Sequence, residues 1–279
     1  MRIEVPNTLY DGIRSIFAPL AFCTEVPSIL DGNTKGVVYT NSYEAPTAAV
    51  MWDGLIGVFV AGIAHDEAFN QDVGLWLAEH PVATARSLGI PGLALAFTPG
   101  SWQTELPRLL SPLEASLDPR FHFSHPGSHV ATQDPGAPYR IVRTSPALMA
   151  RTDIDGIAEV DGWLTPYWHT RNDFFDRGLG YVALADGRQV VSHCVAVFAS
   201  GDRLEFGTAT HPDHRGRGLS TAVAAACVSE ALRRGLEPVW HCWQDNAESA
   251  AVARKVGFRL VREYEVYRCH VPLTSGGTS

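Results

Sequence analysis

The chain has 279 residues, of which 46% are hydrophobic, and its formal net charge is -8. This length is sufficient for one large domain or for two smaller domains, each with its own core. The acidic balance argues against sequence-independent binding of nucleic acid, which requires a basic surface, and it is compatible with a cationic substrate such as an amine.

The cysteines and the hydrophobic runs indicate a cytoplasmic location. The five cysteines form no Cys-x-x-Cys pair and are odd in number, which is typical of reduced, mostly buried thiols. The N-terminal sequence has no signal-peptide pattern, and no apolar run reaches the length of about 18 residues that a membrane helix needs. We therefore expect a cytoplasmic protein without a membrane partner.

Residues 1–128 are predicted to form a smaller N-terminal α+β domain. Apolar periodicity and turn signals such as Asp53-Gly54 place strands between helical segments. The strands are expected at residues 36–40, 48–52, 55–61 and 93–97. The helices are expected at residues 8–31, 69–88 and 102–117, with breaks at prolines. This order weakly echoes the second half of the chain, so a degenerate structural repeat is one interpretation.

Residues 129–138 are the predicted linker, because proline, glycine and polar residues are densest in this part of the chain. A second domain is expected over residues 139–279. Its first strands should be antiparallel, since Asp186-Gly187 is a hairpin turn signal between two apolar runs. These strands are expected at residues 141–143, 181–185, 189–198 and 204–210.

The centre of the second domain is a strand, a turn and a helix. The apolar strand of residues 204–210 leads into the turn His211-Pro-Asp-His-Arg-Gly-Arg-Gly218. Apolar positions over residues 219–234 then recur with helical spacing. A short buried strand at residues 239–243 follows, and a second helix is expected between Asn246 and Gly257.

The turn has the chemistry of a phosphate-binding site. A helix N-terminus leaves amide N–H groups unpaired and carries partial positive charge, so it favours an anion. Gly216 and Gly218 leave the main chain open to a bulky phosphate, and Arg215 and Arg217 add positive charge. The pattern differs from the P-loop and from the dinucleotide-binding fingerprint. The alternative is an ordinary glycine-containing turn with solvated arginines.

Two motifs of this half resemble those of a known superfamily. Arg215-Gly-Arg-Gly-Leu-Ser220 resembles the Arg/Gln-x-x-Gly-x-Gly/Ala signature of the GNAT acyl-CoA-dependent N-acyltransferases. Asn246, followed by Lys255-Val-Gly-Phe258, resembles their second motif. The surrounding residues look like a subgroup that includes zwittermicin-resistance-type acetyltransferases. The resemblance covers residues 138–270 well and the N-terminal part more weakly.

The resemblance implies an α/β (α+β) fold in which a mixed, mostly antiparallel sheet is flanked by helices. Two parallel strands would separate beside the turn and hold the pantetheine arm of acetyl-CoA like an added strand, between Thr208–Thr210 and Trp240–Cys242. For Asn246, capping its own helix is the alternative to such a contact. The implied acetyl-CoA contacts are Thr208, Ala209, Thr210, Arg215, Gly216, Arg217, Gly218, Leu219, Ser220, Asn246 and Ser249.

The resemblance also implies how the reaction is catalysed. Glu205 is the candidate general base, since family members often use a glutamate on this strand. Alternatively, Glu205 lies on the solvent face or orients a neighbour. The tyrosine that many members place seven residues after the asparagine, as general acid, is replaced by Ala253. Tyr264 or Tyr267 would then supply the proton, or no protein acid is used.

Three tryptophans are candidates to bind the substrate. Trp163 and Trp168 precede the helix that borders the implied acceptor site, and Trp240 lies beside the gap. Burial in the core is the alternative for each of them. The adjacent pairs His193-Cys194 and His241-Cys242 do not predict a metal site, because neighbouring residues of a strand point to opposite faces.

The sequence therefore predicts an N-acetyltransferase that moves an acetyl group from acetyl-CoA to a primary amine of a small molecule, such as an antibiotic or a metabolite. Transfer would be direct, within a ternary complex. A non-catalytic acyl-CoA-binding protein is the alternative suggested by Ala253, and a protein N-acetyltransferase is a third. The acceptor, the preferred acyl chain and the oligomeric state, including a homodimer, are left open.

Overall fold

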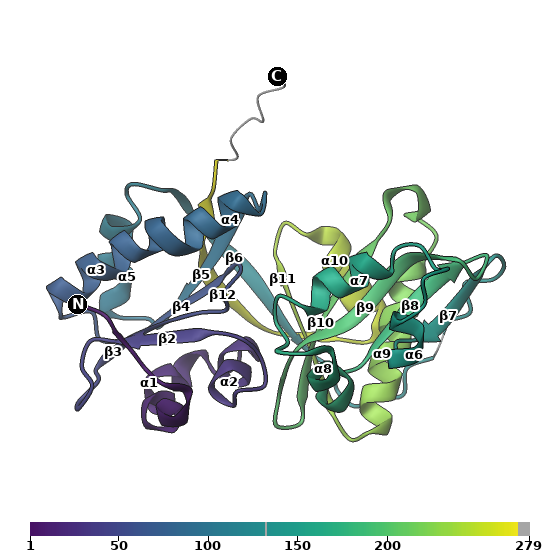
Figure 1. Cartoon of the computed structure of the whole chain (residues 1–279), viewed down its shortest axis with the longest axis horizontal. Helices are drawn as coiled ribbons and strands as arrows, with labels where there is room; N and C mark the ends of the chain where they lie inside the picture. Colours follow the sequence, from purple (N-terminus) through teal and green to yellow (C-terminus); the bar gives the residue numbers. More distant parts are fainter. Residues whose placement is uncertain (132, 273–279) are drawn as a thin grey trace. The chain divides into compact units, whose positions relative to one another are not determined.

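The computed structural model describes residues 1–131 and 133–272, and the chain divides into two compact units (Figure 1). Unit 1 comprises Met1–Pro119 and the chain from Glu265 onward, and unit 2 comprises Arg120–Tyr264. Each unit has its own cluster of buried hydrophobic residues. Within the described residues, every helix is too short or too polar to span a membrane.

Unit 1 is built on a sheet with helices on both faces (Figure 1). Its strands lie in the order β1, β2, β3, β4, β5, β12, and only the pair β4–β5 is parallel. The strands are β1 (Ile3–Glu4), β2 (Val37–Thr40), β3 (Ala48–Trp52), β4 (Gly57–Gly62), β5 (Gly92–Phe97) and β12 (Arg259–His270). The predicted strands of this part of the chain are confirmed.

The helices of unit 1 are short. They are α1 (Arg14–Phe17), α2 (Glu25–Leu30), α3 (Glu67–Leu77), α4 (Ala83–Ser87) and α5 (Ser101–Leu109), with 3₁₀ or π segments at Asn7–Ile13, Ala18–Leu20 and Ala78–Val82. Pro81 lies in the π segment that separates α3 from α4, as its missing N–H predicts. The helix predicted over residues 102–117 ends at Leu109, because the residues after it form β6 (Glu114–Ser124).

The strands of unit 2 lie in the order β6, β11, β10, β9, β8, β7 and pair in a mixed arrangement. Only the pair β10–β11 is parallel. The remaining strands are β7 (Tyr139–Arg143), β8 (Gly180–Ala185), β9 (Gln189–Ser200), β10 (Arg203–Thr210) and β11 (Glu237–Trp243). The helices are α6 (Pro146–Met149), α7 (Ile157–Leu164), α8 (Arg171–Arg177), α9 (Leu219–Arg233) and α10 (Ala247–Val256), with a 3₁₀ turn at Pro212–His214. The predicted hairpin, central helix and final helix are confirmed.

The division into units differs from the predicted domain boundaries. Residues 120–124 of β6 pair with β11 and so belong to unit 2, although residues 1–128 were expected to form one domain. The end of β12 pairs with β5 and so belongs to unit 1. The predicted linker, residues 129–138, lies within unit 2. Both assignments depend on pairing between strands that are distant in sequence, and local composition does not predict such pairing.

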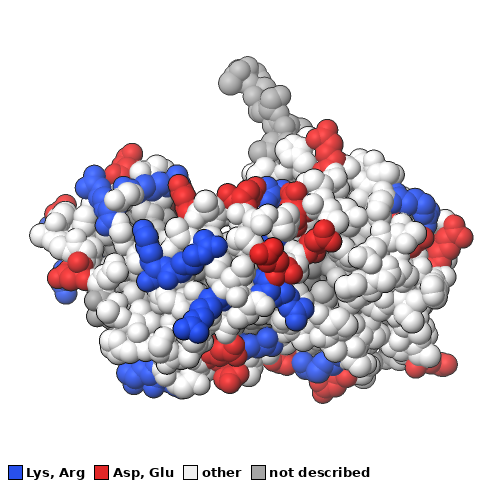
Figure 2. All heavy atoms as spheres, turned by 180° about the vertical axis from the view of Figure 1, so that it is seen from behind, with Lys and Arg blue, Asp and Glu red and all other residues white. Residues whose placement is uncertain are grey.

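The charged side chains do not segregate by sign on the face shown in Figure 2. Lys and Arg side chains are interspersed there with Asp and Glu side chains. The net charge of -8 is therefore not spread over this face as one acidic surface.

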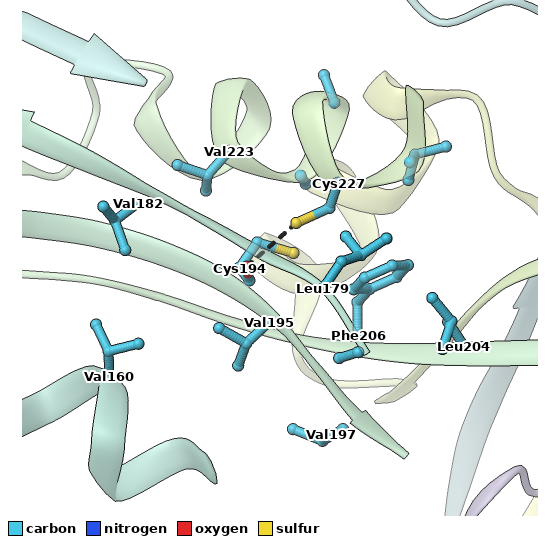
Figure 3. Packing of buried hydrophobic residues seen from close by; sticks show 14 of the residues in the cluster. Val160, Leu179, Val182, Cys194, Val195, Val197, Leu204, Phe206, Val223 and Cys227 are labelled. Carbon is cyan, nitrogen blue, oxygen red and sulfur yellow. Dashed lines mark hydrogen bonds between the residues drawn. The ribbon is translucent and has the colours of Figure 1, made fainter. Parts of the chain in front are cut away.

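The core of unit 2 lies on both faces of β9 (Figure 3). Cys194 points toward α9, where the Cys227 thiol donates a hydrogen bond of 3.1 Å to its carbonyl oxygen. The next residue, Val195, points to the other face, where Val160 of α7 lies. This alternation is the period-two pattern of a strand buried on both faces. β9, and β10 beside it, therefore lie between two layers of helices.

Candidate active site

The two parallel strands of unit 2 separate after three residue pairs. β10 pairs with β11 at Arg203–Glu237, Leu204–Pro238 and Glu205–Val239, and the described ladder ends there, although both strands continue. A register shift between Glu205 and Phe206 marks a β-bulge in the pairing of β10 with β9. The extra residue is Val197 of β9, which lies between the partners of Glu205 and Phe206, and such a residue bends and twists its strand locally. The main-chain edges beyond Glu205 are thus available to an added, strand-like ligand.

The turn that follows β10 requires its two glycines. Gly216 and Gly218 have φ angles of +74° and +77°, a region in which only glycine is unstrained. A Cβ at either position would meet no atom within 4 Å, so the main chain here faces open space. Gly218 is the N-cap of α9 and supplies no side-chain cap, so N–H groups of the first turn remain for a ligand.

A cleft of about 510 Å³ opens beside this turn, between the end of β10 and helix α10. Every predicted acetyl-CoA contact except Arg217 lines it. Two cationic residues, Arg215 and Lys255, also line it, which suits an anionic ligand. Sequence reasoning placed Lys255 in a motif but not in the site. It also missed His214 and Glu248, which carry no local signal for a role in the lining.

Arg217 does not line the cleft, and its side chain is bonded to another strand of unit 2; its contact with acetyl-CoA stays a prediction. Its Nη1 donates a hydrogen bond of 3.0 Å to the hydroxyl of Tyr139, at the start of β7. The same hydroxyl lies 3.0 Å from Nδ1 of His214, within the turn. Arg217 therefore fastens the glycine-rich turn to β7. Its partner is distant in sequence, and no motif predicts the pairing.

Hydroxyl groups fix the end of β10 against its neighbours. The Thr210 hydroxyl lies 2.8 Å from the Ser192 hydroxyl on β9 and 2.6 Å from the Ser220 hydroxyl in the first turn of α9. Thr208 donates a hydrogen bond of 2.6 Å to the carbonyl of His193. These bonds hold the strand end and the helix N-terminus in one geometry, which preorganises the cleft.

Asn246 caps α10, so the capping alternative is confirmed. Its side-chain oxygen accepts a hydrogen bond of 3.0 Å from the N–H of Ser249. The Ser249 hydroxyl in turn accepts a bond of 2.9 Å from Trp240 Nε1. Both residues still line the cleft, so a contact with acetyl-CoA would use the Asn246 amide nitrogen.

Glu205 is buried at the point where the strands part. Glu205 is only 9% exposed. It therefore does not lie on the solvent face of its strand, which was one alternative to its role as a base. Its Oε2 atom is buried and has no hydrogen-bond partner among residues 1–131 and 133–272. Burial raises the pKa of this carboxyl to about 7, although the nearby Arg120 and Arg203 act to lower it.

Glu205 shares one sheet face with several polar side chains. Alternate residues of β6, β10 and β11 point into the core, and the residues between them form the opposite face. We name this opposite face the polar face; it comprises Arg120, His122, Ser124, Arg203, Glu205, Glu237, His241 and Trp243. The rings of His122 and His241 stack 4.5 Å apart. No local motif predicts this pairing, because the two strands are distant along the chain.

The histidines of the polar face are kept neutral. Burial, together with the positive charges of Arg262 and Arg203, lowers the pKa of His122 to about 4. Burial, His122 and the arginines hold the pKa of His241 well below its usual range. His241 Nδ1 lies 2.9 Å from the hydroxyl of Tyr264.

The two candidate acid tyrosines lie in different units. Tyr264 belongs to unit 2 and contacts the polar face through His241. Tyr267 belongs to unit 1, where its ring lies 5.6 Å from that of Phe97 and packs against the buried cluster of that unit. The sequence does not indicate that they belong to different units, because they lie close together on one strand, β12.

Two of the three candidate tryptophans are core residues, which corrects their predicted role as substrate contacts. Trp168 is 1% exposed, and its Nε1 donates a bond of 3.0 Å to the carbonyl of Ala196. Trp240 is 2% exposed and is bonded to Ser249. Trp163 is half-buried; its ring packs against Gly207 and lies 5.2 Å from the ring of His193. Only Trp163 keeps a face available to a ligand.

The chain is similar to known proteins over nearly all of its length. A protein of Bacillus subtilis (strain 168) described as the uncharacterized N-acetyltransferase YdfB is 25% identical over 269 residues, which cover 95% of this chain and 97% of that protein. The crystal structure of a GCN5-related N-acetyltransferase-like protein from Streptococcus suis 89/1591 is similar with a TM-score of 0.70 and 20% identity, over 94% of this chain and 98% of that one. A tandem GNAT protein from the clavulanic acid biosynthesis pathway has a TM-score of 0.53 and 15% identity, over 99% of both chains.

The family model of GNAT acetyltransferases matches residues 119–267, more than half of the sequence. The chain therefore belongs to the GNAT acetyltransferase family, whose members are acyl-CoA-dependent N-acetyltransferases. The match begins and ends close to the bounds of unit 2.

The two tryptophan environments predict different effects on stability. The change Trp168→Phe removes a buried N–H···O bond and part of the packing, so we expect a loss of about 1–3 kcal/mol in the free energy of unfolding. The change Trp163→Phe, at a half-buried position, should cost less. Urea unfolding of both variants measures the difference. An unchanged stability of Trp168→Phe would contradict the core assignment.

The glycine-rich turn predicts a specific loss of acetyl-CoA binding in Gly218→Glu. The new carboxylate would lie where an anion binds, so the dissociation constant measured by calorimetry should rise at least about tenfold, or about 1.4 kcal/mol. Gly235→Glu is the matched control: Gly235 follows the other end of α9, with a φ of +74° and open space around it. Equal weakening in both variants would attribute the loss to backbone strain and not to the cleft.

Proposed function

We propose that this protein transfers the acetyl group of acetyl-CoA to a primary amine of a small molecule. The position of Glu205 carries this proposal: a buried carboxyl lies at the last residue pair before β10 and β11 part. A carboxyl with a pKa of about 7 can accept a proton from an ammonium group near neutral pH. A non-catalytic acyl-CoA-binding protein would not need such a base.

The cleft of unit 2 fits the two polar parts of acetyl-CoA. The open main chain at Gly216 and Gly218, together with Arg215 and Lys255, suits the pyrophosphate. The edges of β10 and β11 beyond their last pair suit the amides of the pantetheine arm, which can bond to them as an added strand does. We assign the main chain at Ala209 or Thr210 to the thioester oxygen, where negative charge develops during the reaction.

Acetyl transfer requires the acceptor nitrogen to lose two protons. Glu205 takes one from the ammonium form, directly or through a water, and the neutral nitrogen then attacks the thioester carbonyl carbon. The carbon–sulfur bond breaks, the nitrogen gives its second proton to water, and the departing sulfur gains a proton from a donor that water then reprotonates. We propose Tyr264 as the donor to the sulfur, because it lies in unit 2 and its hydroxyl contacts His241 on the polar face. Positioning of the amine against the thioester supplies the rest of the acceleration.

The base assignment predicts the pH profile of the reaction. Glu205 must be ionised to accept a proton, so kcat should rise with pH through an apparent pKa of about 7 and then level off. The change Glu205→Gln should lower kcat by about 100-fold or more and remove this rise, because general bases contribute about 10²–10⁴-fold. Acetyl-CoA binding should change little. Release of free thiol, followed from pH 5.5 to 9 in roughly half-unit steps, measures the profile.

A carboxylate elsewhere on the same unit provides the control. Glu159 is exposed on α7, so Glu159→Gln should keep the full rate and the same pH dependence. Retention of wild-type turnover by Glu205→Gln would sink the proposal that this residue is the base.

A further inference from the structure

The hydroxyl of Tyr139 connects two side chains of the glycine-rich turn. Arg217 Nη1 lies 3.0 Å from this hydroxyl on one side, and Nδ1 of His214 lies 3.0 Å from it on the other. Tyr139 begins β7 and is only 8% exposed, and within residues 1–131 and 133–272 its hydroxyl bonds to these two groups. We name the chain of hydrogen bonds from Arg217 through Tyr139 to His214 the relay.

The chemistry of the three groups sets the direction of the relay. A guanidinium only donates hydrogen bonds, so the oxygen of Tyr139 accepts from Arg217. The hydroxyl proton is then donated to Nδ1 of His214. If Nδ1 carried a proton instead, the hydroxyl proton of this buried tyrosine would have no acceptor in the described part of the chain, which is unfavourable. In the neutral imidazole Nδ1 is therefore bare, and the proton lies on Nε2.

His214 brings this proton to the cofactor cleft. It is half-buried and lines the cleft of about 510 Å³ beside Arg215 and Gly216, whereas Tyr139 and Arg217 do not line it. The bond to Tyr139 uses Nδ1, and Nε2 has no hydrogen-bond partner among the described residues. The main-chain N–H of His214 is already bonded to the carbonyl of His211 within the turn, at 2.9 Å. The side chain is thus the part of His214 that can donate to a ligand.

The surroundings of His214 select the kind of ligand. Its neighbours in the cleft are the guanidinium of Arg215 and the open main chain of Gly216 and Gly218, before the first turn of α9. All of these groups are donors or positive charges, so they favour an anion with several acceptor oxygens. A pyrophosphate offers more oxygens than the main-chain N–H groups of one turn can satisfy, and an imidazole N–H is a suitable further donor.

We propose that His214 donates its Nε2–H to a pyrophosphate oxygen of acetyl-CoA, and that Tyr139 and Arg217 are positioning residues that hold the imidazole in this tautomer and orientation. This inference rests on the proposed function and adds a side-chain donor to the same cofactor site. Arg217 thereby acts on the cleft without lining it.

Calorimetric titration of the full chain with CoA and with 3′-dephospho-CoA tests the contact. Both ligands carry the pyrophosphate, and only CoA carries the 3′-phosphate. The change His214→Phe keeps a planar ring and removes both nitrogens, so both dissociation constants should rise about tenfold, as expected for the loss of one charge-assisted hydrogen bond. The change Tyr139→Phe keeps the imidazole but frees its tautomer, so it should weaken both ligands by less.

Two further variants provide the rescue and the control. His214→Gln places an amide N–H close to the position of Nε2, so it should keep part of the affinity that His214→Phe loses. His129 is exposed in the same unit and does not line the cleft, so His129→Phe should bind both ligands as the wild-type chain does.

Nitrogen-15 NMR of the histidine side chains tests the relay in the wild-type chain, so it does not depend on the folding of any variant. At a pH of about 8.5, at which an ordinary imidazole is neutral, His214 should have a bare Nδ1 and a proton on Nε2. Addition of CoA should move the Nε2–H signal downfield, because a bond to a phosphate oxygen deshields this proton. A residue that only shaped the turn would show no such change.

The outcomes separate this inference from the function beneath it. A proton on Nδ1 of His214, an Nε2–H signal that CoA does not move, or unchanged affinity of His214→Phe for both ligands would overturn the inference and keep the acetyl-CoA site. A loss of affinity confined to CoA would assign His214 to the 3′-phosphate and also overturn it. Absence of CoA binding by the wild-type chain would overturn the proposed function as well.

Discussion

The geometry of the site depends on the point at which β10 and β11 stop pairing. Two neighbouring parallel strands normally satisfy each other's main-chain groups along their length, and leaving such groups without partners is costly when they are buried. Here the ladder ends at Glu205 and Val239, beside the register shift between β10 and β9, and the following turn exposes the bare main chain of Gly216 and Gly218. A ligand with amide groups at one end and phosphates at the other can satisfy both.

In the proposed function, the same point also separates cofactor binding from proton transfer. One face of the strands is apolar and packs against α9 and α10, which fixes the cleft. The other face holds a carboxyl that burial keeps partly protonated near neutral pH, two neutral histidines and two arginines. Because side chains alternate along a strand, a few residues of β10 supply both faces. In the proposed function, one short stretch of backbone thus positions both cofactor binding and proton transfer.

The sequence predicts what depends on local pattern and misses what depends on distant pairing. The glycine spacing of the turn, the helical period of α9 and the cap at Asn246 are local, and the structure has each of them. The end of β6 belongs to unit 2 and the end of β12 to unit 1, and both assignments depend on strand partners that are far away in the chain. The contact of Arg217 with Tyr139 has the same origin, and so does the burial of Trp168 against Ala196.

Hydrogen exchange of the backbone amides tests the central claim most directly. If acetyl-CoA binds between the parted strands and the glycine-rich turn, its addition should slow exchange in residues 206–221 and 240–246 of unit 2. The amides of unit 1 that lie within its own sheet, such as those of β3, should exchange at the same rate with and without acetyl-CoA. Protection confined to unit 1, or no protection of residues 206–221 at saturating acetyl-CoA, would contradict the account.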